Sequence, residues 1–172
     1  MIFANNLLLT GPPGIGKSTL IRRVCDALGD RAQAGFITRE LRHDGQRLGF
    51  ELVGLDGRKA LLSHVDLKSP FRVGKYGVDV DGFERFLQTI PFLDPGVEFV
   101  VIDEIGKMEC FSALFREKTR AALGSDKRVL ASIAYRGGGF IAEVKERWDV
   151  HLRTLTWENR DPLLPDIVAR LL

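Results

Sequence analysis

The residues best able to do chemistry lie near the start of the chain, in the glycine-rich stretch GPPGIGKS at residues 11–18. The stretch matches the pattern G-x-x-x-x-G-K-[S/T], in which glycines let backbone amides turn toward phosphate oxygens and a following helix adds its dipole. A lysine here reaches the β- and γ-phosphates, and a serine hydroxyl binds Mg²⁺. We therefore expect a phosphate-binding loop. The residues expected to contact the nucleotide are Gly11, Pro12, Pro13, Gly14, Ile15, Gly16, Lys17, Ser18 and Thr19.

A second candidate group follows the apolar run FVVI, in the stretch FVVIDEIGKME at residues 99–109. An apolar run of this kind predicts a buried parallel strand, whose carboxyl end lies at the edge of the sheet where ligands bind. Asp103 is expected to hold Mg²⁺ together with Ser18. Glu104 is placed to orient or deprotonate an attacking water molecule. Lys17 and Glu104 are thus the expected catalytic residues.

Strand and helix patterns alternate along the chain and predict an α/β fold with a mainly parallel sheet and helices on both faces. After the loop, apolar residues repeat at helical spacing until Gly29. The predicted strands are 7–9, 99–103 and 128–134, and the further predicted helices are 81–90, 112–123, 139–147 and 162–171. Asp161 is expected to cap the last of these helices.

The stretch 34–63 departs from this alternation, because it carries the turn signals HDGQ and LDGR between strand-like runs. We interpret it as a β-hairpin inserted into a single domain that spans residues 1–172. The glycine-rich segments 74–82 and 136–140 are interpreted as loops.

Composition excludes some classes of protein. The net charge is only +2, which disfavours a broad nucleic-acid-binding face. The two cysteines, Cys25 and Cys110, have no histidine near them at metal-ligand spacing, so buried thiols are expected. The N-terminal stretch has the features of neither a signal peptide nor a spanning helix, so we expect a cytoplasmic protein without membrane attachment.

Beyond the single motifs, the stretches TGPPGIGKSTL, GFITRELR, VGKYGVDV, VIDEIGKMECF and LTWENRD occur together in one order and spacing. In this the chain resembles the small nucleoside-triphosphatases first described from thermophilic microbes, whose vertebrate members are called cancer-related nucleoside triphosphatase. The resemblance implies a three-layer P-loop fold with a RecA-like sheet and an added antiparallel hairpin. It also implies Mg²⁺-dependent hydrolysis of ATP, GTP, CTP and UTP with little choice of base.

The sequence departs from that family pattern at two places. Trp157 stands where proline is usual, which bears on base stacking, and SIAYRGGGF replaces a commoner stretch on the γ-phosphate side. Asn159 and Arg160 in the motif ENRD are candidate nucleotide contacts, with pairing at the helix end as the alternative. The candidate phosphate or lid contacts are Lys107, Lys75, Tyr76 and Arg136, each with a surface role as the alternative.

Two other functions stay open at this point. A small-molecule or nucleotide kinase uses the same loop but passes the phosphate to an organic acceptor. A nucleotide-dependent binding module uses slow hydrolysis to time a conformational change. The sequence names no protein partner, and nucleic acid is not favoured.

Overall fold

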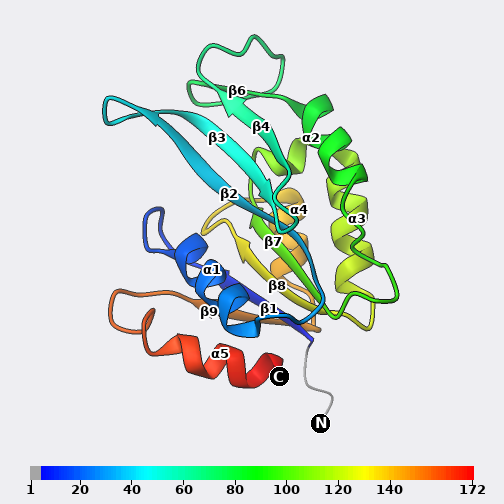
Figure 1. The fold of residues 1–172 in the computed structure, drawn as a ribbon. Helices are drawn as coiled ribbons and strands as arrows, with labels where there is room; N and C mark the ends of the chain where they lie inside the picture. The colour runs from blue at the N-terminus through cyan, green and yellow to red at the C-terminus, as the bar shows by residue number, and fades with distance from the viewer. Residues whose placement is uncertain (1–4) are drawn as a thin grey trace.

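The computed structural model describes residues 5–172, which form an α/β fold built on one mixed sheet (Figure 1). Within this range the sheet has nine strands in the order β5-β6-β4-β3-β2-β7-β8-β1-β9. The strands are β1 (Asn6–Thr10), β2 (Gln33–His43), β3 (Gln46–Gly54), β4 (Lys59–His64), β5 (Arg72–Val73), β6 (Tyr76–Val78), β7 (Phe99–Ile105), β8 (Arg128–Ile133) and β9 (Val150–Thr154). The helices are α1 (Lys17–Leu28), α2 (Val80–Gln88), α3 (Ala113–Leu123), α4 (Gly139–Lys145) and α5 (Leu163–Leu171), with a 3₁₀ turn at Glu109–Phe111.

Strands β2, β7, β8, β1 and β9 are parallel and form the half of the sheet that carries the phosphate-binding loop. One strand, β8, lies between β1, which leads into the loop, and β7, which carries the acidic pair. This arrangement confirms the predicted RecA-like sheet with its added antiparallel part. Because these strands are parallel, their carboxyl ends meet at one edge.

Helices cover both faces of the parallel half, which gives three layers (Figure 1). Alternate residues of β1 point to opposite faces. Leu7 and Leu9 pack with the buried side chains of α1 and α5, whereas Leu8 packs with those of α2, α3 and α4. Both faces of the strand are therefore buried, as its continuous apolar run predicts.

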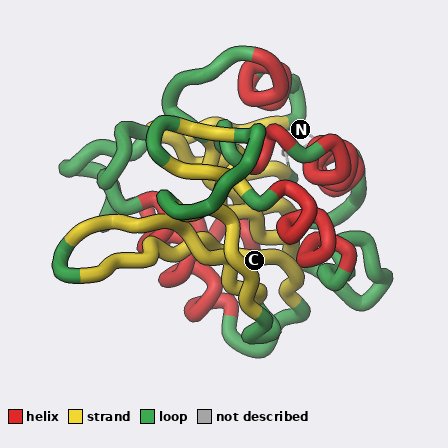
Figure 2. The backbone as a smooth tube through the Cα atoms, turned by 90° about the horizontal axis from the view of Figure 1, so that it is seen from above, coloured by secondary structure: helices red, strands yellow, loops and turns green. Residues whose placement is uncertain are grey.

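The antiparallel part begins in β2. Gln33–Phe36 pair in parallel with β7, whereas Phe36–His43 pair with β3, so the outer half of β2 continues past β7 as one strand of a hairpin. Asp44 and Gly45 form its two-residue turn with φ values of 47° and 77°, the positive values that an Asp-Gly turn of this kind requires. The hairpin is the long two-stranded projection visible in Figure 2.

Three details differ from the sequence-based predictions. β9 and the two-residue β5 have no counterpart among the predicted strands, and residues 76–78, interpreted as loop, form β6. Asp161 does not cap α5: the helix begins at Leu163, and the Asp161 carboxylate pairs with Arg23 at 3.3 Å. No helix within residues 5–172 is long and apolar enough to span a membrane.

Candidate active site

The glycine-rich stretch forms a tight loop between β1 and the start of α1. Gly14 and Gly16 have φ values of 78° and 107°, which side chains rarely allow, so glycine is required at both positions. The loop opens directly into α1, whose first residue is Lys17. The ammonium group of Lys17 folds back over the loop and donates a hydrogen bond to the Gly11 carbonyl at 2.8 Å. A concave set of backbone amides and one cation thus lies at the N-terminus of a helix, a typical anion-binding arrangement.

Asp103 lies deep in the site, near the end of β7, and is 1% exposed. Its carboxylate accepts hydrogen bonds from the Ser132 hydroxyl on β8 and from the Thr38 amide on β2, the latter at 3.3 Å. Burial raises the pKa of this carboxyl, while the hydroxyls of Ser132 and Ser18 and the Thr38 amide act in the opposite direction. Neighbouring strands on both sides of β7 therefore hold the Asp103 side chain in place.

Ser18 and Asp103 have the donor chemistry that Mg²⁺ prefers. Mg²⁺ binds hard oxygen ligands and usually takes one or two protein groups together with phosphate oxygens and water. The Ser18 hydroxyl lies close enough to the Asp103 carboxylate to lower its pKa. A hydroxyl and a carboxylate thus converge beside the phosphate-binding loop, and this pair fits the ion.

Glu104 follows Asp103 where β7 bulges, since the pairing with β8 shifts register between Ile102 and Ile105. One of its oxygens lies 3.8 Å from the Lys17 nitrogen. Burial raises the pKa of this carboxyl, the charge of Lys17 lowers it, and the charge of Asp103 raises it further. A carboxylate whose basicity is raised in this way can take a proton from water.

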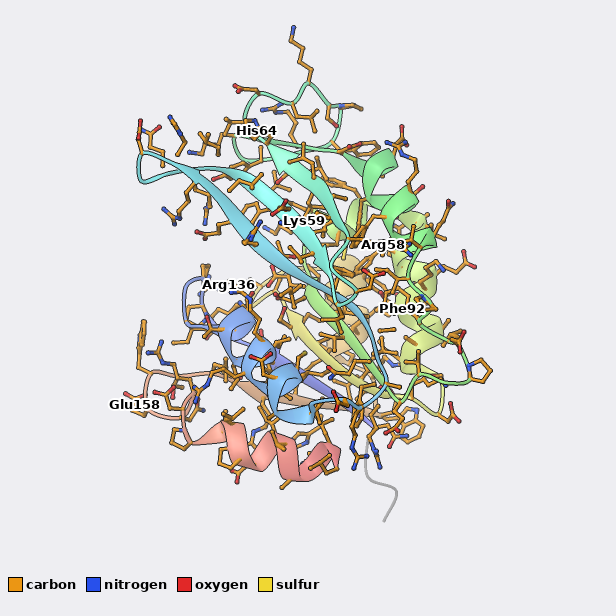
Figure 3. The ribbon with its side chains drawn as sticks, viewed as in Figure 1. Arg58, Lys59, His64, Phe92, Arg136 and Glu158 are labelled. Carbon is orange, nitrogen blue, oxygen red and sulfur yellow. The ribbon has the colours of Figure 1, made fainter. Side chains whose placement is uncertain are left out.

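These residues open onto a pocket of about 970 Å³ at the carboxyl edge of the sheet. One side consists of the loop residues 11–19, Asp103 and Glu104. Lys107 and Arg136 also line the pocket, and Arg136 lies between the phosphate-binding loop and the hairpin in Figure 3. The opposite wall comes from the antiparallel part and is made of Thr38, Arg39, Glu40, Arg47, Phe50, Leu62 and Val73.

Comparison with known proteins fits this geometry. A family model described as NTPase matches residues 6–168. The chain belongs to the NTPase family. It is 39% identical over 166 residues to the nucleoside-triphosphatase THEP1 of Thermotoga sp. (strain RQ2), covering 96% of this chain and 94% of that protein. It is 40% identical over 184 residues to the cancer-related nucleoside-triphosphatase of Homo sapiens, covering 96% of each.

A solved member of the NTPase family has the same fold. The crystal structure of THEP1 from the hyperthermophile Aquifex aeolicus superimposes with a TM-score of 0.84 at 34% sequence identity. The match covers 96% of this chain and 98% of that one, so it includes the hairpin as well as the parallel half of the sheet.

Two expected nucleotide contacts of this NTPase-family chain, Asn159 and Arg160, lie on the loop that follows β9. β9 pairs in parallel with β1, so this loop comes out beside the phosphate-binding loop. Arg160 donates a hydrogen bond to the Ile15 carbonyl at 3.3 Å. The Asn159 side chain bonds to the backbone of Thr154 and Thr156 at 2.9 and 2.8 Å. Both residues therefore border the loop, but neither lines the large pocket.

The expected lid residues Lys75 and Tyr76 lie in the β5–β6 turn and in β6, and neither lines the pocket. Tyr76 is 7% exposed, and its hydroxyl accepts a hydrogen bond from Arg47 at 2.8 Å. Its ring packs edge-on against Phe50. Tyr76 thus supports the wall of the pocket from behind, and Lys75 stays exposed at the turn.

Sequence reasoning assigned no role to Glu109, which the structure places in the pocket. Its side chain is nearly buried, and burial raises the pKa of its carboxyl well above the usual value, with a further contribution from the charge of Glu104. Glu109 is the last residue of the motif DEIGKME, but the sequence pattern alone indicates no function for it. Thr38 and Arg47 were missed in the same way, because their positions depend on how the hairpin folds over the site.

Proposed function

We propose that the protein is a Mg²⁺-dependent nucleoside-triphosphatase that cleaves nucleoside triphosphates to diphosphates and phosphate with broad base tolerance. The observation that carries the proposal is the convergence of Lys17, Asp103 and Glu104 on one pocket at the carboxyl edge of the sheet. The relatives are named nucleoside-triphosphatases, which supports the same reaction class.

In this proposal each residue of the site has a defined role in the reaction. The loop amides and Lys17 bind the β- and γ-phosphates, and Ser18 and Asp103 hold Mg²⁺. When bound, the ion neutralises phosphate charge. Glu104 takes a proton from water while the water oxygen bonds to the γ-phosphorus. The bond from that phosphorus to the β,γ-bridging oxygen breaks, and its electron pair leaves with the nucleoside diphosphate.

Broad base tolerance is supported by the loop after β9. Asn159 is the amide side chain of this loop, and both its oxygen and its nitrogen already bond to the chain's own backbone. These two bonds use one of its two N–H donors and one of its two acceptor lone pairs, which leaves it fewer groups with which to read the hydrogen-bonding edge of a base. Binding energy then comes mainly from the phosphates, which all nucleoside triphosphates share.

The test is phosphate release from ATP, GTP, CTP and UTP by the wild type and by Lys17→Ala and Glu104→Gln. We expect turnover of all four substrates, loss of binding in the first variant, and binding without turnover in the second. Chelating Mg²⁺ should stop the wild-type reaction. Lys68→Ala and Glu117→Gln, both at exposed positions outside the pocket, are the matched controls and should remain active. Full activity of Glu104→Gln would contradict its role as the base.

One observation favours testing a second function, phosphoryl transfer to an organic acceptor. The pocket wall opposite the phosphate-binding loop contains the apolar side chains Phe50, Leu62 and Val73, which water as the acceptor does not need. The products distinguish the two reactions. Hydrolysis yields one free phosphate per diphosphate, whereas a kinase yields a phosphorylated acceptor in its place. Nucleosides and nucleoside monophosphates are suitable acceptors for this assay.

A further inference from the structure

Trp157 is a large aromatic side chain left exposed beside the phosphate-binding loop. It is 66% exposed and lies three residues beyond the end of β9, at the same sheet edge as the loop. Large aromatic groups are usually buried, because burial removes apolar surface from water. An aromatic ring exposed at a ligand-binding edge is therefore a candidate surface for a ligand to cover.

Arg160 ties this ring to the phosphate-binding loop. Its guanidinium carbon lies 4.6 Å from the centre of the Trp157 ring, within the range of a cation–π contact. The same guanidinium bonds to the Ile15 carbonyl and lies 3.6 Å from the position a side chain would take at Gly16. Asn159 fixes the turn between them through its two backbone hydrogen bonds. The indole thus has a defined place relative to the site of the phosphates.

The direction of a bound nucleotide follows from the two sides of the loop. Asp103 and Glu104, the groups proposed to act at the γ-phosphate, come from β7. β7 and β9 lie on opposite sides of β1 in the sheet order. In Figure 3, accordingly, Arg136 lies on the hairpin side of the phosphate-binding loop and Glu158 on the other side. A triphosphate whose γ end points toward Glu104 directs its nucleoside toward the loop that carries Trp157.

We propose that Trp157 stacks against the base of the bound nucleotide, with Arg160 holding the indole beside the phosphate-binding loop. This inference rests on the proposed function and adds the subsite for the base. Stacking uses the π-face that every base has, so it binds all four bases without reading their edges. It favours purines over pyrimidines, because the larger ring system overlaps more of the indole.

The experiment compares a ligand that has a base with one that has none. The probes are ADP and inorganic tripolyphosphate, and the variants are Trp157→Ala, Trp157→Phe and Trp148→Ala. Trp148 is the matched control, since it is 85% exposed but precedes β9 and so lies at the opposite end of that strand. Stacking of one base on an aromatic side chain is worth about 1–3 kcal/mol, which corresponds to roughly a 5- to 150-fold change in affinity.

We expect Trp157→Ala to weaken ADP binding at least about fivefold while the affinity for tripolyphosphate changes less than twofold. Trp157→Phe should keep most of the ADP affinity, and Trp148→Ala should behave like the wild type. In a Trp148→Phe background, ADP should quench the fluorescence of the remaining Trp157, and tripolyphosphate should not.

Three results would overturn the inference. If Trp157→Ala binds ADP like the wild type while both ligands bind, the base lies elsewhere and the proposed hydrolase stands. If that variant loses ADP and tripolyphosphate equally, Trp157 only supports the loop. If neither ligand binds to the wild type, the proposed function fails, and this subsite fails with it.

Discussion

Gly106→Ala is expected to slow hydrolysis without unfolding the protein. A methyl group built at Gly106 would lie 2.7 Å from a Glu104 oxygen and 2.8 Å from a Glu109 oxygen. Ordinary contact begins at 3.4 Å, so the Glu104 oxygen must retreat by about 0.7 Å. All the close atoms belong to side chains, including the Glu104 Cγ at 3.0 Å and the carboxylate of the buried Glu109, so these side chains rather than the backbone must shift. A misplacement of about 1 Å at a reacting group can cost about 100-fold in rate, so we expect kcat to fall about 10- to 100-fold.

The assay is phosphate release at saturating MgATP, together with the Kd for ADP and the midpoint of thermal unfolding. The Kd should stay close to the wild-type value, because the methyl group does not touch the phosphate-binding loop, and the midpoint should fall only slightly, because the close contacts are with side chains and not with backbone. Gly96→Ala, in a surface turn with its nearest neighbouring atom at 3.4 Å, is the matched control. If Gly106→Ala retains the wild-type kcat, the reasoning is refuted: Glu104 does not act from the position that the structure gives it.

Three further predictions concern stability and reactivity. Gly35→Ala should destabilise the fold by at least about 3 kcal/mol in urea denaturation, since its methyl group would lie 1.9 Å from the Val101 carbonyl oxygen; an unchanged midpoint contradicts this. Burial raises the pKa of Cys25 to about 11 and of Cys110 to about 12, so both thiols are neutral at pH 8. Iodoacetamide should modify these half-buried thiols slowly at that pH, faster toward pH 11 and fastest after denaturation, and rapid modification of the native protein at pH 8 would contradict the raised pKa values. Glu143→Gln should leave the unfolding temperature unchanged, because its pair with Arg120 is exposed to solvent; a clear drop would show that this pair matters.

The parallel half of the fold could be predicted because its strands are buried on both faces. Short apolar runs such as those of β1, β7 and β8 are typical of buried parallel strands. Gly29 ends α1 as expected, with a φ of 60°. β9 escaped prediction because its sequence, VHLRT, has no apolar run. It lies at the edge of the sheet and pairs with β1 alone, so partial burial suffices. β6 escaped because it has only three residues, one of them Gly77, and so carries too little pattern.

Some residues of the candidate site could be predicted from the sequence, and others could not. Asp103 and Glu104 could be placed from sequence, because an acidic pair after a buried strand comes out at the edge where the phosphate-binding loop lies. The opposite wall could not, since Arg47 and Phe50 reach the pocket only through the length and twist of the hairpin. Glu109 required the 3₁₀ turn that directs its side chain back toward Glu104.

The extension of β2 beyond its partner β7 gives the pocket two walls of separate origin. The half of the sheet that carries the phosphate-binding loop is covered by helices on both faces, whereas the hairpin is held at its base by the pairing of β2 with β7 and of β3 with β4, and its tip extends beyond both partners. Residues inserted or deleted at the Asp44–Gly45 tip would change the reach of this arm and leave Lys17, Asp103 and Glu104 in register. In evolutionary terms, the chain can change what the outer wall admits to the pocket without rebuilding the edge that we propose holds the phosphates.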